Sequence, residues 1–388
     1  MKKKTAYSIP GKKITTRQFL KKSVGAAGGM YLLCTQPSLF NSLEYLINEG
    51  PGKWSRESMF YEQTPRGTKC LVCPNECTLK PGETSDCHNR INYKGILYSI
   101  AYGNPCAVNL DPVEKKPLLH FLPQTLTYSI ATAGCNLTCL NCQNWNISQA
   151  SPKETKNYDL LPAQVVEKAK KNNCRSIAYT YSEPITFYEY VYDTSRLSHS
   201  SGIKNILVSN GYINQEPLEK LCPHLDAANI DLKSFSEKIY LKLTAGKLQP
   251  VLDTLKTLKK NKVWLEITNL VIPGWTDDMG MIREMCSWLY ENGFKDTPLH
   301  FSRFHPMYKL TQLPPTPFST LLKARKTAQE CGLLYVYIGN VPIKGTEDTI
   351  CPACSKKVIE RIGFKVTASH LNEGKCAFCN TSIAGIWE

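Results

Sequence analysis

Three cysteines fall close together in the stretch GCNLTCLNCQNWN, which covers residues 134–146. They are Cys135, Cys139 and Cys142, and cysteine thiolates are ligands for zinc and for iron–sulfur clusters. Both kinds of centre usually take four protein ligands, so a set of three leaves one position open or draws a ligand from far away. Three thiolates on one short loop can hold three irons of a [4Fe–4S] cluster, with the fourth iron free for another ligand. A zinc knuckle with a distant fourth ligand, or a redox pair beside an uninvolved cysteine, is the alternative.

Two further cysteine sets flank this triplet. The C-terminal set has zinc-ribbon spacing, because 21 residues separate its two C-x2-C pairs, and it predicts a closed structural site for zinc or a mononuclear iron. The N-terminal set is more irregular; it favours zinc, with a second iron–sulfur cluster that relays electrons as the alternative. Such spacings in a chain with 17 cysteines indicate metal binding rather than a disulfide framework. The N-terminal set is Cys70, Cys73, Cys77 and Cys87, and the C-terminal set is Cys351, Cys354, Cys376 and Cys379.

Apolar runs of the length of buried strands alternate with helical patterns through the middle of the chain. The runs fall at 127–133, 176–181, 203–209, 226–232, 263–272, 298–304 and 333–338. The helical patterns fall at 162–172, 184–198, 216–222, 249–260, 277–291 and 317–331. Strands that alternate with helices predict a parallel sheet. Six or seven such units predict a full or partial β/α barrel, in which chemistry takes place at the C-terminal ends of the strands. The triplet follows the first run and therefore falls at that end.

The predicted fold class is therefore α/β: a partial (β/α)6-type TIM-like barrel with a small cysteine-rich, metal-binding module at each end. We expect a basic arm or export-signal-like segment with a linker at 1–60 and an N-terminal cysteine-rich module at 61–120. The core barrel is expected at 121–342, and a C-terminal zinc-ribbon-like module at 343–388.

Motifs at the strand ends identify a resemblance. The C-x3-C-x2-C triplet after the first strand resembles the radical S-adenosylmethionine (SAM) superfamily. YSEP at 181–184 stands where that family has GGEP; SNG at 209–211, DLK at 231–233 and IPGWTDD at 272–278 resemble the TNG, DLK and VPGWSDD elements of glycyl-radical activating enzymes. Five motifs in this order, one per strand, resemble the activating enzymes of pyruvate formate-lyase over residues 125–340.

A wider set of segments is closer still to one branch, the AmmeMemoRadiSam-system radical SAM enzymes. These segments are CLVCPNEC, DPVEKKPLLHF, CQNWNISQ, TYSEP and YVYIGN, and they extend the resemblance to about residues 66–388. The chain also departs from the superfamily pattern. Asn141 stands where an aromatic residue often contacts adenine, with Trp145 nearby. Val208 stands where the activating enzymes have an acidic residue, and Tyr181 and Ser182 replace the two glycines of GGEP, so only their backbone role carries over.

The resemblance implies an oxidoreductase-type radical SAM enzyme. In that superfamily the free iron of the cluster binds the amino and carboxylate groups of SAM, and reductive cleavage of SAM forms a 5′-deoxyadenosyl radical that abstracts hydrogen from a substrate. The resemblance suggests a protein substrate of the glycyl-radical type and a low-potential electron donor such as flavodoxin or ferredoxin. The implied SAM-site residues are Tyr181, Ser182, Glu183, Asn210, Asp231, Lys233 and His305. A non-catalytic or electron-transfer iron–sulfur/zinc protein is the alternative from a different class.

The charge distribution bears on partners and location. Of the formal net charge of +14, eight positive charges lie in residues 1–22, so only about +6 remains for the rest of the chain. That balance argues against a nucleic-acid-binding surface. The basic arm followed by a short apolar stretch resembles an export signal with an incomplete twin-arginine motif, since Thr16 precedes Arg17. Because radical SAM chemistry needs SAM and a low-potential reductant, we expect a cytoplasmic protein, with residues 1–34 able to rest on an anionic membrane surface.

Overall fold

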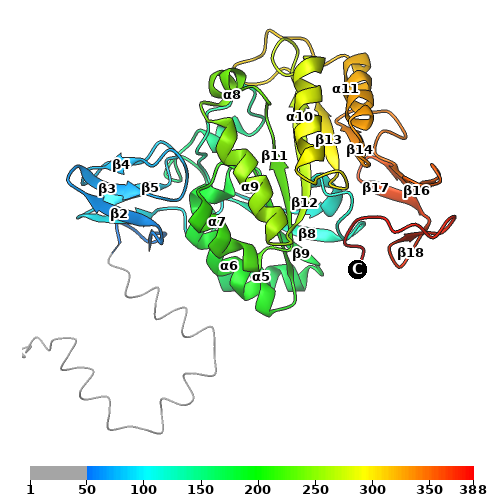
Figure 1. Cartoon of the computed structure of the whole chain (residues 1–388). Helices are drawn as coiled ribbons and strands as arrows, with labels where there is room; N and C mark the ends of the chain where they lie inside the picture. The colour runs from blue at the N-terminus through cyan, green and yellow to red at the C-terminus, as the bar shows by residue number, and fades with distance from the viewer. Residues whose placement is uncertain (1–49) are drawn as a thin grey trace, which may run out of the picture. The chain divides into compact units, whose positions relative to one another are not determined.

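The computed structural model describes residues 50–388, which form one unit. An eight-stranded sheet runs through it in the order β14-β13-β12-β11-β10-β9-β8-β7 (Figure 1). Every pairing from β8 to β14 is parallel, while β7 pairs with β8 in the antiparallel sense. The strands are β7 (Ala107–Pro112), β8 (Leu126–Ala131), β9 (Ser176–Tyr179), β10 (Lys204–Ser209), β11 (Ala227–Asp231), β12 (Trp264–Val271), β13 (Leu299–Arg303) and β14 (Val336–Gly339).

Helices connect the parallel strands. All six helical patterns expected from the sequence are present: α5 (Pro162–Lys171), α6 (Tyr188–Ser200), α7 (Gln215–Leu221), α9 (Leu248–Lys260), α10 (Met279–Glu291) and α11 (Phe318–Glu330). Two further helices were not expected, α4 (Trp145–Ser148) and α8 (Glu237–Thr244), and short 3-10 turns lie at 113–115, 184–187 and 222–224. The predicted α/β class with a mostly parallel central sheet is confirmed. The sheet has seven parallel strands and one antiparallel strand, and within residues 50–388 β14 and β7 form its two edges, so the barrel is partial.

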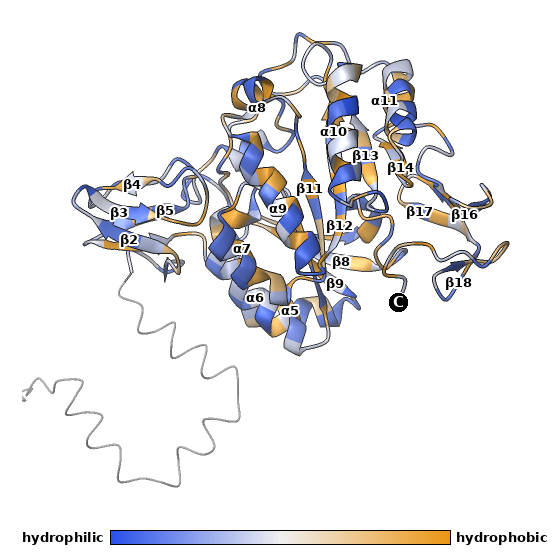
Figure 2. Cartoon of the chain, in the orientation of Figure 1, coloured by the Kyte–Doolittle hydropathy of each residue, from blue (hydrophilic) through white to orange (hydrophobic). Residues whose placement is uncertain are grey.

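Helix α9 illustrates why these segments fold as they do. Val251, Leu252, Leu255 and Leu258 recur at helical spacing, and all four are buried against the sheet, whereas the lysines between and after them are exposed. Figure 2 shows the same mixture of apolar and polar residues along α9. Burial of one apolar face per helix forms the main core of the unit.

Small antiparallel sheets precede and follow the central sheet. Residues 56–99 hold β1 (Arg56–Glu57), β2 (Tyr61–Thr64), β3 (Gly67–Cys70), β4 (Thr78–Leu79), β5 (Arg90–Tyr93) and β6 (Ile96–Ser99). Residues 349–376 hold β15 (Thr349–Ile350), β16 (Lys357–Ile362), β17 (Lys365–Ser369), β18 (Leu371–Asn372) and β19 (Lys375–Cys376). Strand β7 lies within the range expected for the N-terminal module yet pairs with the central sheet. The domain boundaries themselves stay a prediction.

The basic arm lies almost wholly outside the described residues, and with it the export-signal and membrane-contact predictions for residues 1–34. Among the helices of residues 50–388, none combines the length and the apolar character that crossing a bilayer requires.

Candidate active site

A large cavity of about 1030 Å³ opens at the C-terminal ends of the parallel strands. It collects every residue that the sequence assigned to the cluster and to the SAM site. These residues are Cys135, Cys139, Cys142, Tyr181, Ser182, Glu183, Asn210, Asp231, Lys233 and His305. They come from the triplet loop after β8 and from the ends of β9, β10, β11 and β13, so the fold brings together side chains up to 170 positions apart in sequence.

The triplet loop is held by the short helix α8, which the sequence analysis missed. The amide of Thr138 donates to the carbonyl oxygen of Thr244 at 3.0 Å, and the amide of Leu140 donates to that of Leu243 at 2.9 Å. Ser236 caps the N-terminus of helix α8, because its hydroxyl accepts from the amide of Ile239. The backbone on either side of Cys139 is therefore fixed by packing rather than by the cysteines themselves.

Glu183 joins the ends of β9 and β10. Its carboxylate accepts hydrogen bonds from the hydroxyl of Ser209 at 2.7 Å and from the amides of Asn210 at 2.9 Å and Ile185 at 3.2 Å. Only 2% of Glu183 is exposed. Burial raises the pKa of Glu183 to about 7, although these hydrogen bonds act in the opposite direction.

Glu183→Gln is expected to remove a pH dependence of stability. Because the native carboxyl keeps its proton to a higher pH than the unfolded one, its contribution to the free energy of unfolding is full below about pH 4.5 and is lost as the pH rises toward about 7. The loss is at most about 3.5 kcal/mol, since one pKa unit corresponds to about 1.4 kcal/mol. Urea titrations of the chain without bound iron, at about pH 4.5 and about pH 7.5, should show the gap between wild type and variant changing with pH. Parallel pH profiles would contradict this role for Glu183.

Asn210 connects strand β10 to the triplet loop. Its side-chain amide donates to Asn136 Oδ1 at 2.8 Å and lies 3.8 Å from Cys135 Sγ. Asn136 in turn donates to the carbonyl oxygen of Tyr212 at 2.7 Å. The side chain of Asn210 thus contacts the first cysteine of the triplet, while its own backbone amide donates to Glu183.

Lys233 follows the end of β11 and lies near Cys139, the second cysteine of the triplet. Its ammonium group is 2.8 Å from Asp231 Oδ2. Burial alone would lower the pKa of Lys233, but the negative charges of Asp231 and Cys139 outweigh it and raise the pKa well above its usual value. The pKa of Cys139 is raised to about 11 by burial, with Lys233 acting against that shift. The positive charge of Lys233 therefore favours the thiolate form of Cys139.

A buried polar cluster around Asp111 forms another part of the cavity wall, and the sequence analysis did not single it out. Asp111 accepts hydrogen bonds from Lys115, Lys116 and Tyr181, with Lys116 Nζ at 2.6 Å from Asp111 Oδ2. The Lys116 ammonium also lies 4.4 Å from the ring centroid of Tyr181. Burial opposes ionisation of Asp111, yet these hydrogen bonds hold its pKa well below the usual range, while burial lowers the pKa of Lys116 to about 8. Asp111 and Lys116 belong to the DPVEKK segment at 111–116, which was used above only as evidence of the resemblance and not as a site.

The far wall of the cavity includes residues from both the last strands and the C-terminal module. Arg303 ends β13, His305 lies just beyond it, and Asn340 follows β14. Gly363 and Phe364, from the turn between β16 and β17, also line the cavity. The module expected to be purely structural therefore contributes to the shape of this opening.

The residues present fit a thiolate-bound cluster with a small polar ligand. Three cysteines on one loop line the same cavity as carboxylate, amide and ammonium groups. Asn141, directly before Cys142, has a buried Oδ1 atom that lacks a hydrogen-bond partner within residues 50–388, and Asn141 also lines the cavity. A buried acceptor of this kind is costly unless a donor reaches it, so an amino group of a bound ligand would satisfy it.

The C-terminal cysteines form a compact group that could hold a metal. The ligand sulfurs of Cys351, Cys354, Cys376 and Cys379 all lie within 4.8 Å of one another. Individual separations are 3.6 Å for Cys351–Cys379 and 3.7 Å for Cys354–Cys376. Four sulfurs around one tetrahedral ion with bonds of about 2.3 Å lie about 3.8 Å apart, so this geometry matches a single ion.

Comparisons with known proteins agree with this site. The model of the Radical SAM superfamily matches residues 129–286. An uncharacterized protein of Methanocaldococcus jannaschii is 45% identical over 331 residues, which cover 84% of this chain and 98% of that protein. The pyruvate formate-lyase 1-activating enzyme of Escherichia coli K12 is 28% identical over 151 residues, or 37% of this chain and 61% of the enzyme.

Among solved structures, a domain of the pyruvate-formate lyase-activating enzyme from Bacteroides vulgatus aligns with a TM-score of 0.37 and 14% identity. That alignment covers 42% of this chain and 99% of the domain. The assignment rests on the sequence matches, which include the triplet and the ends of strands β9 to β12. This chain belongs to the radical SAM superfamily and is homologous to the activating enzymes of pyruvate formate-lyase.

Proposed function

We propose that the large cavity is the site of reductive SAM cleavage and of hydrogen abstraction from a substrate. The observation that carries the proposal is that one cavity is lined by the cysteine triplet together with residues from each of the four strand-end motifs. A [4Fe–4S] cluster on Cys135, Cys139 and Cys142 would supply the electron that cleaves SAM to methionine and a 5′-deoxyadenosyl radical.

The surrounding side chains would bind and orient SAM. Backbone groups at Tyr181 and Ser182, with Asn210, would meet the methionine part, and the Lys233 ammonium would offer a positive charge to its carboxylate. Glu183 would hold the ends of β9 and β10 in place through its three hydrogen bonds. His305 is proposed to line the substrate side. Enclosure by the strand ends would exclude water from a reactive radical.

Homology to pyruvate formate-lyase and 4-hydroxyphenylacetate decarboxylase activating enzymes suggests a protein substrate and an external one-electron reductant. We propose a glycyl-radical-type protein as the substrate and a flavodoxin or ferredoxin as the donor. Cytoplasmic location, membership of the AmmeMemoRadiSam branch and the module boundaries stay predictions.

The proposal is tested by anaerobic reconstitution of the full chain with iron and sulfide, reduction, and incubation with SAM. Chromatography should detect 5′-deoxyadenosine and methionine in equal amounts. A chain with a full complement of reduced cluster that leaves SAM intact would contradict the proposal and favour an electron-transfer role.

For the C-terminal set we propose a structural zinc ion. Cys354→Ser is expected to remove one zinc per chain and to lower the stability of residues 349–388, because metal binding contributes directly to the folding of small cysteine modules. Cleavage of SAM should continue at a reduced rate, because Gly363 and Phe364 of this module line the large cavity although none of the four cysteines does. Elemental analysis together with the 5′-deoxyadenosine assay measures both. Iron with sulfide at this set, or an unchanged zinc content in the variant, would contradict the assignment.

A further inference from the structure

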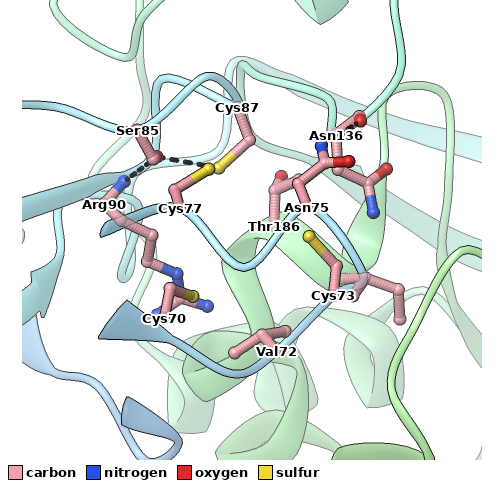
Figure 3. Close-up of a pocket in the computed structure, with 11 residues that line it drawn as sticks. Cys70, Val72, Cys73, Asn75, Cys77, Ser85, Cys87, Arg90, Asn136 and Thr186 are labelled. Atoms are coloured by element: carbon pink, nitrogen blue, oxygen red, sulfur yellow. Dashed lines mark hydrogen bonds between the residues drawn. The ribbon is translucent and has the colours of Figure 1, made fainter. Parts of the chain in front are cut away.

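The four N-terminal cysteines line a second, separate cavity (Figure 3). Cys70, Cys73, Cys77 and Cys87 are free thiols, and Cys70 and Cys87 are buried. The cavity measures about 20 Å³, which is room for about one water molecule. All four cysteines line this one space.

The spread of these sulfurs differs from that of the C-terminal set. Within residues 50–388, the C-terminal group is the one place where three or more Cys, His, Asp or Glu ligand atoms all lie within 4.8 Å. Neither the N-terminal set nor the triplet meets that limit. Zinc needs its thiolates about 3.8 Å apart. An iron–sulfur cluster binds its thiolates at the outer corners of a larger core, so its ligands lie further apart.

Arg90 provides independent evidence that this cavity holds a ligand. The side chain is 1% exposed and lines the cavity. Its Nη1 donates to Ser58 Oγ at 2.9 Å and to Glu189. Its Nη2 atom is buried and has no hydrogen-bond partner within residues 50–388. A buried donor without an acceptor costs roughly 1–3 kcal/mol, whereas cluster sulfides and thiolates accept such hydrogen bonds.

The cavity shares a wall with the triplet loop. Asn136, Ile185 and Thr186 line it together with the cysteines. Asn75 Nδ2 donates to the carbonyl oxygen of Asn136 at 2.8 Å, and Asn89 Nδ2 donates to that of Ala133 at 2.7 Å. The N-terminal cysteines are therefore packed against the loop that carries Cys135.

From these observations we propose that Cys70, Cys73, Cys77 and Cys87 bind a second iron–sulfur cluster of the [4Fe–4S] class, with Arg90 as a hydrogen-bond donor to it. This replaces the zinc ion that the spacing favoured. The proposal stands apart from SAM cleavage, because it concerns a site that shares no cysteine with the triplet.

The test uses the full chain with Cys135, Cys139 and Cys142 all changed to alanine and reconstituted anaerobically. This variant should retain iron and acid-labile sulfide in equal amounts and give an EPR signal on reduction with dithionite. Adding Cys73→Ala should abolish both, whereas adding Cys331→Ala, at the end of α11, should leave them unchanged. In the otherwise wild-type chain, Cys73→Ala should halve the iron content, which gives a second measurement if the triple variant folds poorly.

Two results would overturn the proposal: a second zinc per chain with no sulfide, or no metal beyond that of the C-terminal set. Since the triple variant cannot assemble the triplet cluster, neither result depends on whether the wild-type chain cleaves SAM. Arg90→Lys, which keeps the charge opposite Glu189 but removes the second donor nitrogen, should shift the cluster midpoint potential to a more negative value. An unchanged potential would remove Arg90 from the site.

Discussion

Replacing Cys139 with alanine is expected to abolish production of 5′-deoxyadenosine from SAM while leaving the fold intact. Two thiolates cannot hold the cluster that three bind, so the iron of this site should be lost. The loop itself should persist, because its backbone is bonded to Thr244 and Leu243 of α8 independently of the cysteine side chain. Product formation should fall to background, and circular dichroism and the melting temperature should differ little between the iron-free variant and the iron-free wild type.

Cys331→Ala is the matched control. Cys331 is a partly buried cysteine outside all three sets, and its sulfur lies 3.7 Å from the hydroxyl of Ser287, away from the cavity. The control should cleave SAM at the wild-type rate. Continued cleavage in the Cys139→Ala chain would refute the assignment of the triplet, whereas equal loss in both variants would point to general damage.

Gly134→Ala is expected to have an equally large effect by a different route. Gly134 has φ = +97°, and a Cβ atom there would overlap the carbonyl oxygen of Cys87 and lie 2.7 Å from Asn89 Nδ2. Backbone strain costs about 1–2 kcal/mol, and overpacking typically adds about 1–3 kcal/mol. The variant should therefore lose roughly 2–5 kcal/mol of stability, and it should bind less iron at both the triplet and the N-terminal cysteines. Urea unfolding and iron analysis measure the two effects.

Gly82→Ala separates strain from collision. Gly82 has a similar φ of +90°, but no heavy atom lies within 4 Å of the position that its Cβ would take. This control should show only the strain cost and retain its iron. If both variants lose the same stability and the same iron, contact between Cys87 and Gly134 has no special importance.

Much of the central fold could be predicted because its signals are local. Each of the seven parallel strands overlaps an apolar run. The apolar residues of α9 recur at helical spacing, so this helix could be predicted from its own residues. The ends of those strands carry motif residues, so their meeting at one edge follows from parallel pairing. Parallel pairing together with the motif resemblance was sufficient to place Glu183, Asn210 and Lys233 in one cavity.

What could not be predicted depends on partners far away in sequence. Strand β7 could not be recognised without its antiparallel pairing with β8. Helix α8 has only eight residues, too few to show a clear helical period. Lys116 resembles a surface lysine, yet Asp111 holds it in a buried position. Cysteine spacing likewise could not distinguish zinc from a cluster at the N-terminal set, because the number of residues between two cysteines does not determine the distance between their sulfur atoms.

The packing of the N-terminal cysteine segment also sets the order of events during synthesis. Residues 71 and 72 accept hydrogen bonds from Asn214, which lies 143 positions after Leu71. At about 5–20 residues per second, roughly 7–29 s of translation separate the emergence of these two segments from the ribosome. Throughout that interval the first four cysteines of the folded unit lack the surface that later covers them. Nascent chains therefore expose those thiols to oxidants, competing metals and chaperones before the segment around Asn214 has been synthesised and can pack beside them.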